Sequence, residues 1–179
     1  MRADARRNLG RIIGAAEAEI LKHGPDVSMT AIAEHAGVAV GTLYRHYPTK
    51  KALVEAVITA FVAHIVDRAS HAASSITAAG DAMMQIEKLL VDFVEDAAAN
   101  PGLKAAVTAV DATFITRDQE ERGLVALRQL VAAAQKDGDL RDFVRAEDIF
   151  LLMIVAPTTH PQPIRDHWLR LTLAGLRSS

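Results

Sequence analysis

The chain has 179 residues, of which half are hydrophobic and none is cysteine. The lack of cysteine excludes disulfides, thiolate metal sites and cysteine nucleophiles. The longest strongly apolar run, residues 149–156, is too short to cross a bilayer. Glu17 and Glu19 interrupt any apolar core of a signal peptide. We therefore expect a protein of the cytoplasm that has no membrane partner.

The net charge of −2 is unevenly distributed along the chain. Residues 1–51 hold eight Lys and Arg against five Asp and Glu, a net charge of +3, whereas the remainder carries −5. A basic head on an acidic body suggests that one end of the chain meets a polyanion. Chance unevenness in a short chain is the alternative explanation.

Helical periodicity dominates the first third of the sequence. Apolar residues at a spacing of 3.6 predict a first helix over residues 9–20, which stops at residues 23–25, His-Gly-Pro. Ser28 is the expected N-cap of a short second helix, and Gly37 is its expected left-handed C-terminal residue. A third short helix is predicted over about residues 40–47.

The same periodicity continues to the end of the chain. Pro48 breaks the third helix, and Thr49 caps a long fourth helix that runs from Lys50 to about Ser70. Loop residues after it include Ser74, and prolines including Pro163 form the connection before the last helix. Five further helices are predicted around residues 83–94, 103–110, 124–134, 147–156 and 164–175. No segment shows sustained alternation, so we predict an all-α fold of about nine helices.

The most informative stretch is residues 28–51, SMTAIAEHAGVAVGTLYRHYPTKK. It describes two short helices joined by a tight glycine turn, which is the pattern of a helix-turn-helix. With Leu43 buried, the third helix presents hydroxyl, phenol and guanidinium groups that can contact phosphates and bases. A plain helical hairpin with a solvated face is the alternative.

The segment AIAEHAGVAVGTLYRHYPTKKAL resembles the signature of the TetR family of bacterial repressors, IAxxAGVSxGTLYxHFxxKxxL. The match covers residues 32–53 and extends to the first helix. It implies a three-helix DNA-binding domain over residues 1–50, followed by a helical ligand-binding and dimerisation domain over residues 51–179. It also implies that the protein is a homodimer and that it represses transcription from a pseudo-palindromic double-stranded operator.

The resemblance assigns DNA contacts residue by residue. Thr42, Tyr44 and His46 fall on positions that contact the DNA backbone, and Lys50 falls on a frequent phosphate contact. Val40 and Arg45 occupy variable positions that help to set sequence preference. The expected DNA-binding residues are Thr30, Val40, Thr42, Tyr44, Arg45, His46 and Lys50.

Two residues depart from the family pattern. The family usually has Ser where Ala39 stands, and Ala forfeits a helix cap worth about 1 kcal/mol. The family often has Lys where Val40 stands, and Val can touch a thymine methyl group but cannot grip a phosphate. These departures concern base reading and leave the expected fold unchanged.

The later helices are expected to bind a small effector, as they do in the family. Met and Phe at helical spacing are more often ordinary core, but these side chains are also suited to an apolar or weakly polar ligand. The expected ligand-binding residues are Phe61, Ile65, Met83, Phe93, Phe114 and Met153. The eighth and ninth helices carry more apolar residues than one core can bury, so they are expected to form the dimer interface.

Other sites and other functions carry weaker signals. His64, Asp67, Arg68 and His71 share one helix face, where an ion pair is more typical than a metal site because Arg disfavours a bound cation. No phosphate-binding loop, nucleophile elbow, dinucleotide-binding pattern or HExxH is present, so we expect neither an enzyme nor a cofactor. A helical scaffold or interaction protein with a vestigial helix-turn-helix, and a small helical enzyme or carrier, remain the competing functions.

Overall fold

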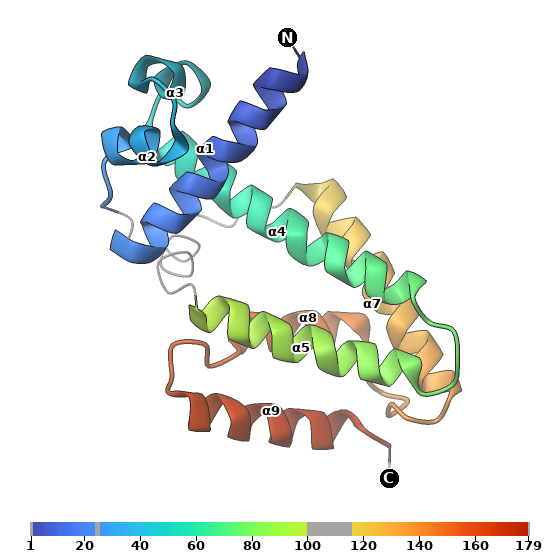
Figure 1. Ribbon diagram of the computed structural model, residues 1–179. Helices are drawn as coiled ribbons and strands as arrows, with labels where there is room; N and C mark the ends of the chain where they lie inside the picture. Colours follow the sequence, from blue (N-terminus) through green and yellow to red (C-terminus); the bar gives the residue numbers. More distant parts are fainter. Residues whose placement is uncertain (1, 24–25, 100–115, 179) are drawn as a thin grey trace. The chain divides into compact units, whose positions relative to one another are not determined.

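The computed structural model describes residues 2–23, 26–99 and 116–178, and every regular element within these ranges is a helix. The only β-type pairing there is an isolated bridge between Leu140 and Arg177. The predicted all-α class is confirmed (Figure 1). The helices are α1 (Arg2–His23), α2 (Met29–Ala36), α3 (Val40–His46), α4 (Lys50–Ser74), α5 (Asp81–Ala99), α7 (Arg117–Lys136), α8 (Ala146–Val155) and α9 (Gln162–Leu176).

The chain forms two compact units, and the division between them falls inside α4, after Val62. The described residues of the N-terminal unit are 2–23 and 26–62, and those of the C-terminal unit are 63–99 and 116–178. Both units therefore share one continuous helix. The sequence-based boundary between residues 50 and 51 remains a prediction.

The N-terminal unit packs α2 against α1 and α3 against α2. Its core is aliphatic and is built around fully buried Ile12, Ile32, Leu43 and Leu53. These residues come from α1, α2, α3 and α4 in turn, so one side chain from each helix meets in the centre. Burying such side chains stabilises the unit by roughly 1.5–3 kcal/mol each relative to exposure.

Local signals set the boundaries of α2 and the start of α4. The Ser28 hydroxyl accepts a hydrogen bond from the Ala31 amide at 3.1 Å, as expected of an N-cap. Gly37 ends α2 with φ +63°, a left-handed conformation that glycine adopts without a Cβ penalty. The Thr49 hydroxyl accepts from the Ala52 amide at 3.1 Å and caps α4. All three predicted boundary residues are confirmed.

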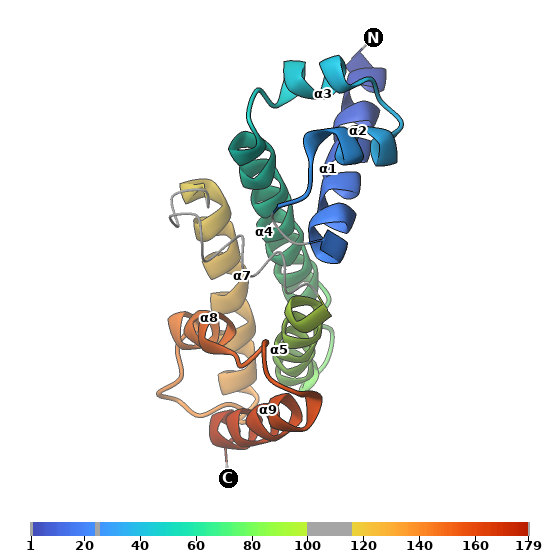
Figure 2. The same cartoon turned by 90° about the vertical axis from the view of Figure 1, so that its left-hand side faces the viewer.

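The C-terminal unit is centred on α5, which packs against α7, α8 and α9 (Figure 2). Its core includes fully buried Ile86, Leu90, Leu130 and Ile149. Thr116 begins α7 with a capping box, in which its hydroxyl accepts from the Gln119 amide and the Gln119 side chain accepts in return. The unit is therefore held by the same kind of aliphatic core and local capping as the N-terminal one.

Charged side chains fix α4 to its neighbours in the C-terminal unit. Arg68 on α4 lies 2.6 Å from Asp92 and also pairs with Asp96, both on α5. Asp67, the residue before it, pairs with Arg122 on α7 at 2.9 Å. Two adjacent residues of opposite charge thus attach α4 to α5 and α7 respectively.

Three sequence-based expectations differ from the structure or fall outside it. Helix α4 continues to Ser74 instead of ending near Ser70, because Ala72 in the additional turn is buried in the C-terminal core. Pro163 lies in the first turn of α9, where a missing amide hydrogen costs no intrahelical bond. The helix predicted around residues 103–110 lies outside the described residues.

The structure describes no helix that is long and apolar enough to cross a membrane.

The start of α3 gives a first test of these local interactions. Ala39 occupies the N-cap position with φ −64° and ψ 140° but has no side chain that can accept a hydrogen bond. We expect Ala39→Ser to raise the free energy of unfolding by about 0.5–2 kcal/mol, because a hydroxyl would bond a free amide of the first turn. Ser28→Ala should lower it by a similar amount. Urea denaturation of both variants measures the free energy of unfolding. If Ala39→Ser leaves this free energy unchanged, a side chain at residue 39 cannot cap α3.

Candidate nucleic-acid interface

Helix α3 presents most of its side chains outward. Leu43 is its one fully buried residue and anchors the helix to the N-terminal core. Tyr44 is 47% exposed, and Arg45 and His46 are exposed beside it. Thr42 is half-buried. A short helix that buries a single aliphatic residue and exposes a phenol, a guanidinium and an imidazole has the form of a recognition helix.

The turn that leads into α3 is braced from α1. The Arg11 guanidinium donates to the Ala36 carbonyl at 2.6 Å and to the Gly37 carbonyl at 3.3 Å. A Cβ added at Gly37 would lie 2.5 Å from Arg11 Nη2, in addition to being strained by the positive φ. Glycine is therefore required here for two reasons, and Arg11 fixes the turn that sets the direction of α3.

A second polar link joins α1 to α2. His35 Nδ1 donates to the Glu19 carboxylate at 2.8 Å, and His23 Nε2 lies 3.6 Å from the other carboxylate oxygen. Glu19 is only 15% exposed. The hydrogen bond from His35, with the charges of His23 and Lys22, holds the pKa of Glu19 below its ordinary value. Glu19 is thus a carboxylate that the N-terminal unit keeps ionised between two helices.

The remaining predicted DNA-binding residues lie at the starts of α2, α3 and α4. Thr30 is exposed in the first turn of α2. Lys50 is half-exposed and is the first residue of α4. Val40 is half-buried and packs against the N-terminal core, so only part of its side chain faces solvent. All seven predicted residues belong to the N-terminal unit, five of them on α3.

Sequence reasoning did not identify Arg11, Glu19 or His35 as residues that shape this surface. Arg11 and its acceptor Ala36 are 25 positions apart, and Glu19 and His35 are 16 apart. No local spacing rule connects residues at such separations. In the sequence these residues have the appearance of solvated charges, so no signal was available for their contacts.

The predicted ligand-binding residues are divided between the cores of the two units, and none of them lines the groove described below. Met83 and Met153 are buried in the core of the C-terminal unit, and Ile65 and Phe93 pack against that core. Phe61 packs against the core of the N-terminal unit. Phe114 lies outside the described residues. Their role as ligand contacts remains a prediction.

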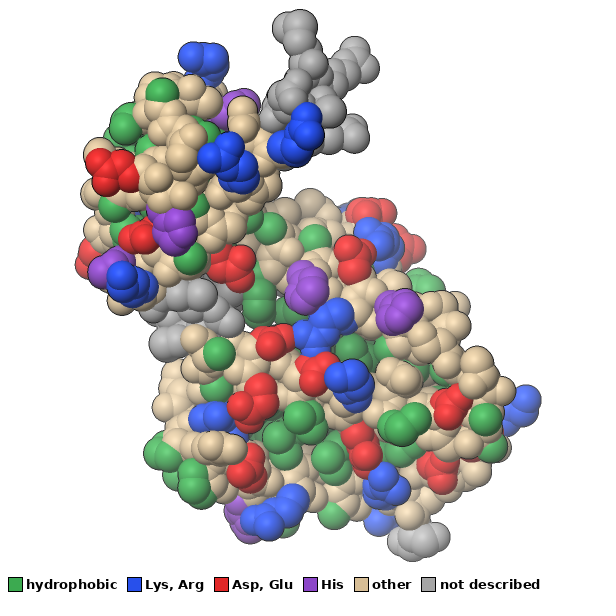
Figure 3. All heavy atoms as spheres, in the orientation of Figure 1, with side chains coloured by type: hydrophobic (Ala, Val, Ile, Leu, Met, Phe, Trp, Pro, Cys, Tyr) green, Lys and Arg blue, Asp and Glu red, His purple; other side chains and the backbone are tan. Residues whose placement is uncertain are grey.

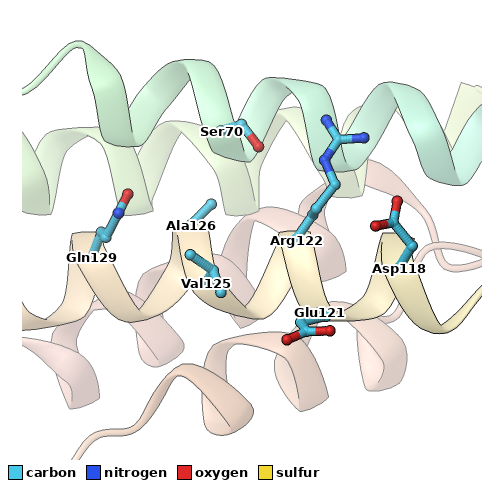
Figure 4. A pocket seen from close by; sticks show the side chains of 7 residues that line it. All are labelled: Ser70, Asp118, Glu121, Arg122, Val125, Ala126 and Gln129. Carbon is cyan, nitrogen blue, oxygen red and sulfur yellow. The ribbon is translucent and has the colours of Figure 1, made fainter.

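The structure describes a cavity elsewhere, an open groove of about 370 Å³ between α4 and α7 (Figure 4). Arg122 rises from α7 toward α4, whereas Glu121 points away from α4. The lining is mixed in polarity and consists of Ser70, Asp118, Glu121, Arg122, Val125, Ala126 and Gln129. This groove is more polar than the apolar setting that the sequence predicts for an effector.

The face of α4 that carries His64, Asp67, Arg68 and His71 is organised by ion pairs. Asp67 and Arg68 pair with α7 and α5, as described above. Among the described residues, no group of three or more His, Cys, Asp or Glu side chains could hold a metal ion. On the face shown in Figure 3, acidic and basic side chains of the C-terminal unit are interspersed with apolar patches.

Two family models match most of the chain. Residues 12–57 match bacterial regulatory proteins of the tetR family, and residues 85–178 match the C-terminal domain of SbtR-like transcriptional regulators. The first match contains the second half of α1, all of α2 and α3 and the start of α4, and the second contains most of α5 and all of α7, α8 and α9. No protein of curated function matches the sequence significantly.

Solved structures match the whole chain. A TetR transcription regulatory protein from Mycobacterium vanbaalenii is 34% identical, with a TM-score of 0.77 over 98% of both chains. The TetR transcriptional regulator SCO0520 from Streptomyces coelicolor is 28% identical, with a TM-score of 0.69 over 95% of this chain and 98% of that one. With its exposed recognition helix, this chain belongs to the TetR family of bacterial regulatory proteins and is a ligand-responsive, DNA-binding transcriptional repressor.

Proposed function

We propose that two copies of this protein bind the two halves of a pseudo-palindromic operator, each placing α3 in the major groove. The observation that carries this proposal is the construction of α3, which buries Leu43 alone and turns Tyr44, Arg45 and His46 to solvent. The turn before it is fixed by Arg11, so the exposed side chains are held in a defined direction.

Each predicted residue has a distinct role in the proposed complex. The Thr42 and Tyr44 hydroxyls and the His46 imidazole bond phosphates, and Lys50 at the start of α4 supplies a charge to the backbone. Arg45 reads a guanine edge through two hydrogen bonds. Val40 contacts a thymine methyl group with the exposed part of its side chain, and Thr30 bonds a phosphate or base from α2. Because the target is chromosomal DNA, the protein acts in the bacterial cytoplasm.

DNA-binding variants separate phosphate contacts from base reading. Tyr44→Ala and Lys50→Ala should weaken binding to operator and random duplex alike, because phosphates carry no sequence information. Arg45→Ala should cost about 1–3 kcal/mol at the operator and relax preference at one base pair. The measurement is a titration of each variant with an operator selected from a random DNA pool and with random duplex, at two salt concentrations.

Lys136→Ala is the matched control, because it removes one positive charge from the end of α7 in the C-terminal unit. It should bind both duplexes like the unmodified protein. Equal losses of Arg45→Ala on operator and random DNA would show that Arg45 only positions the protein.

Members of the family dimerise, and we propose that this chain does so through α8 and α9. Both helices expose large apolar side chains that their own unit leaves uncovered. Leu151 and Ile154 on α8 are 55% and 59% exposed, and Leu171 on α9 is 61% exposed. Val155 and Ile164 are also exposed on these helices. Two helices from each copy can bury these residues in an isologous four-helix bundle.

Ile154→Glu should convert the dimer to a monomer without lowering the stability of the isolated fold, because the side chain is not part of the monomer core. The loss of the dimer should lower the affinity for the operator, because one molecule could no longer bind both half-sites together. Met84→Glu on α5 is the matched control, as Met84 is 56% exposed and lies outside the proposed interface. Light scattering at micromolar concentration measures the mass. A monomeric unmodified protein would refute the proposal.

We propose that the effector is an apolar or weakly polar small molecule bound within the C-terminal unit near Ile65, Met83, Phe93 and Met153. These side chains form or adjoin its core, so a ligand must rearrange their packing to enter. A highly charged ligand would lose too much hydration energy in such a setting. Because α4 runs without interruption from Lys50 to Ser74, a displacement of its C-terminal half is carried by the same helix that begins at a DNA contact.

Linkage makes the effector proposal testable. If the ligand weakens operator binding by some factor, operator must weaken ligand binding by the same factor. We expect a thermal-shift screen of aromatic and medium-chain aliphatic compounds to yield ligands whose affinity falls when operator is present. Calorimetric titration with and without operator measures this factor. Ligands that bind equally tightly in both conditions would contradict an inducer site.

A further inference from the structure

Gly41 is an exposed helical residue whose small size nothing in the described part of the chain explains. It is the second residue of α3 and has no positive φ, and a Cβ built on it would meet no atom of residues 2–23, 26–99 or 116–178 within 4 Å. Glycine in a helix is less favourable than alanine because it loses more conformational freedom on folding. Neither backbone conformation nor packing inside the chain therefore requires glycine at this position.

Gly41 lies on the exposed face of α3, so the reason for a glycine is to be sought in a molecule that binds this face. Residues three and four apart share a helix face, so Gly41 lies on the same face as Tyr44 and Arg45. The buried Leu43 lies on the other side of α3. Gly10, Gly14 and Gly175 are also helical and open, so an open glycine alone indicates nothing. Gly41 differs from these glycines because it lies in the first turn of the recognition helix, on the face that carries the exposed Tyr44 and Arg45.

We propose that Gly41 is a close-approach residue, at which the DNA packs directly against the backbone of α3. This inference rests on the DNA-binding function proposed above. Tyr44 and Arg45 reach the duplex at a depth that the missing side chain permits. A methyl group at residue 41 would hold the helix away from the groove, and the hydrogen bonds of Arg45 would lengthen beyond the distance at which they are effective. Gly41 is thus a positioning residue for base reading.

The test compares Gly41→Ala with Gly14→Ala and the unmodified protein. Both variants add one methyl group to an exposed, open helical glycine of the N-terminal unit, so Gly14→Ala is a matched control. Affinities are measured for an operator selected from a random pool and for random duplex. The thermal midpoint of unfolding is measured for each protein.

We expect Gly41→Ala to bind operator at least about tenfold more weakly, the equivalent of about 1.4 kcal/mol. Its loss on random duplex should be smaller, because only specific contacts need the full depth of the groove. The thermal midpoint should stay equal or rise by about 2–4 °C, since alanine favours the helix. Gly14→Ala should show the same thermal effect with unchanged operator affinity. A simultaneous gain in stability and loss in binding is a signature that structural damage cannot produce.

Three results would overturn the inference. Operator affinity of Gly41→Ala within about twofold of the unmodified protein would show that the DNA does not approach residue 41 closely. A lowered thermal midpoint would show that the fold itself requires the glycine. An equal loss of affinity in Gly14→Ala would show that the effect is not specific to α3. Failure of the unmodified protein to bind any duplex would instead refute the proposed function, and this inference with it.

Discussion

The turn between α2 and α3 is the constraint on which the N-terminal unit depends. The chain must change direction there within three residues, and Gly37 allows this by adopting a left-handed conformation. The Ala36 carbonyl at the end of α2 and the Gly37 carbonyl after it both accept hydrogen bonds from Arg11. Charge-assisted hydrogen bonds of this kind are stronger than neutral ones. One side chain of α1 therefore stabilises the end of α2 and fixes the direction in which α3 leaves it.

Helix α4 connects the unit that holds α3 to the C-terminal unit. Its first residues belong to the core that holds α3, and its last turns are paired by charge with α5 and α7. The ion pairs of Asp67 and Arg68 are partly exposed, so they add little to the free energy of unfolding and mainly fix the rotation of α4 about its axis. Their value lies in specificity, because two adjacent opposite charges can satisfy their partners in only one rotation of the helix.

The features that the sequence predicts correctly depend on residues that are close together in the chain. Ser28, Gly37 and Thr49 act within four residues of themselves, and their capping roles follow from residue type and spacing. The exposed character of Tyr44 and Arg45 follows from their offset to Leu43. About the first third of the chain, and the positions of the later helices, can be predicted in this way.

The features that the sequence does not reveal depend on contacts between distant residues. Arg11 and Glu19 look like solvated charges until the fold brings Ala36 and His35 to them. Met83 and Met153 show why an effector site resists prediction, because core and pocket residues share the same apolar type and helical spacing. The polar groove between α4 and α7 is likewise formed only when two helices meet.

The slight anchoring of α3 has a consequence for its motion. Helix α3 has seven residues, one fully buried leucine and no side-chain cap, so we expect it to open locally before the rest of the N-terminal unit unfolds. Its amides are then among the first of the folded chain to exchange with solvent.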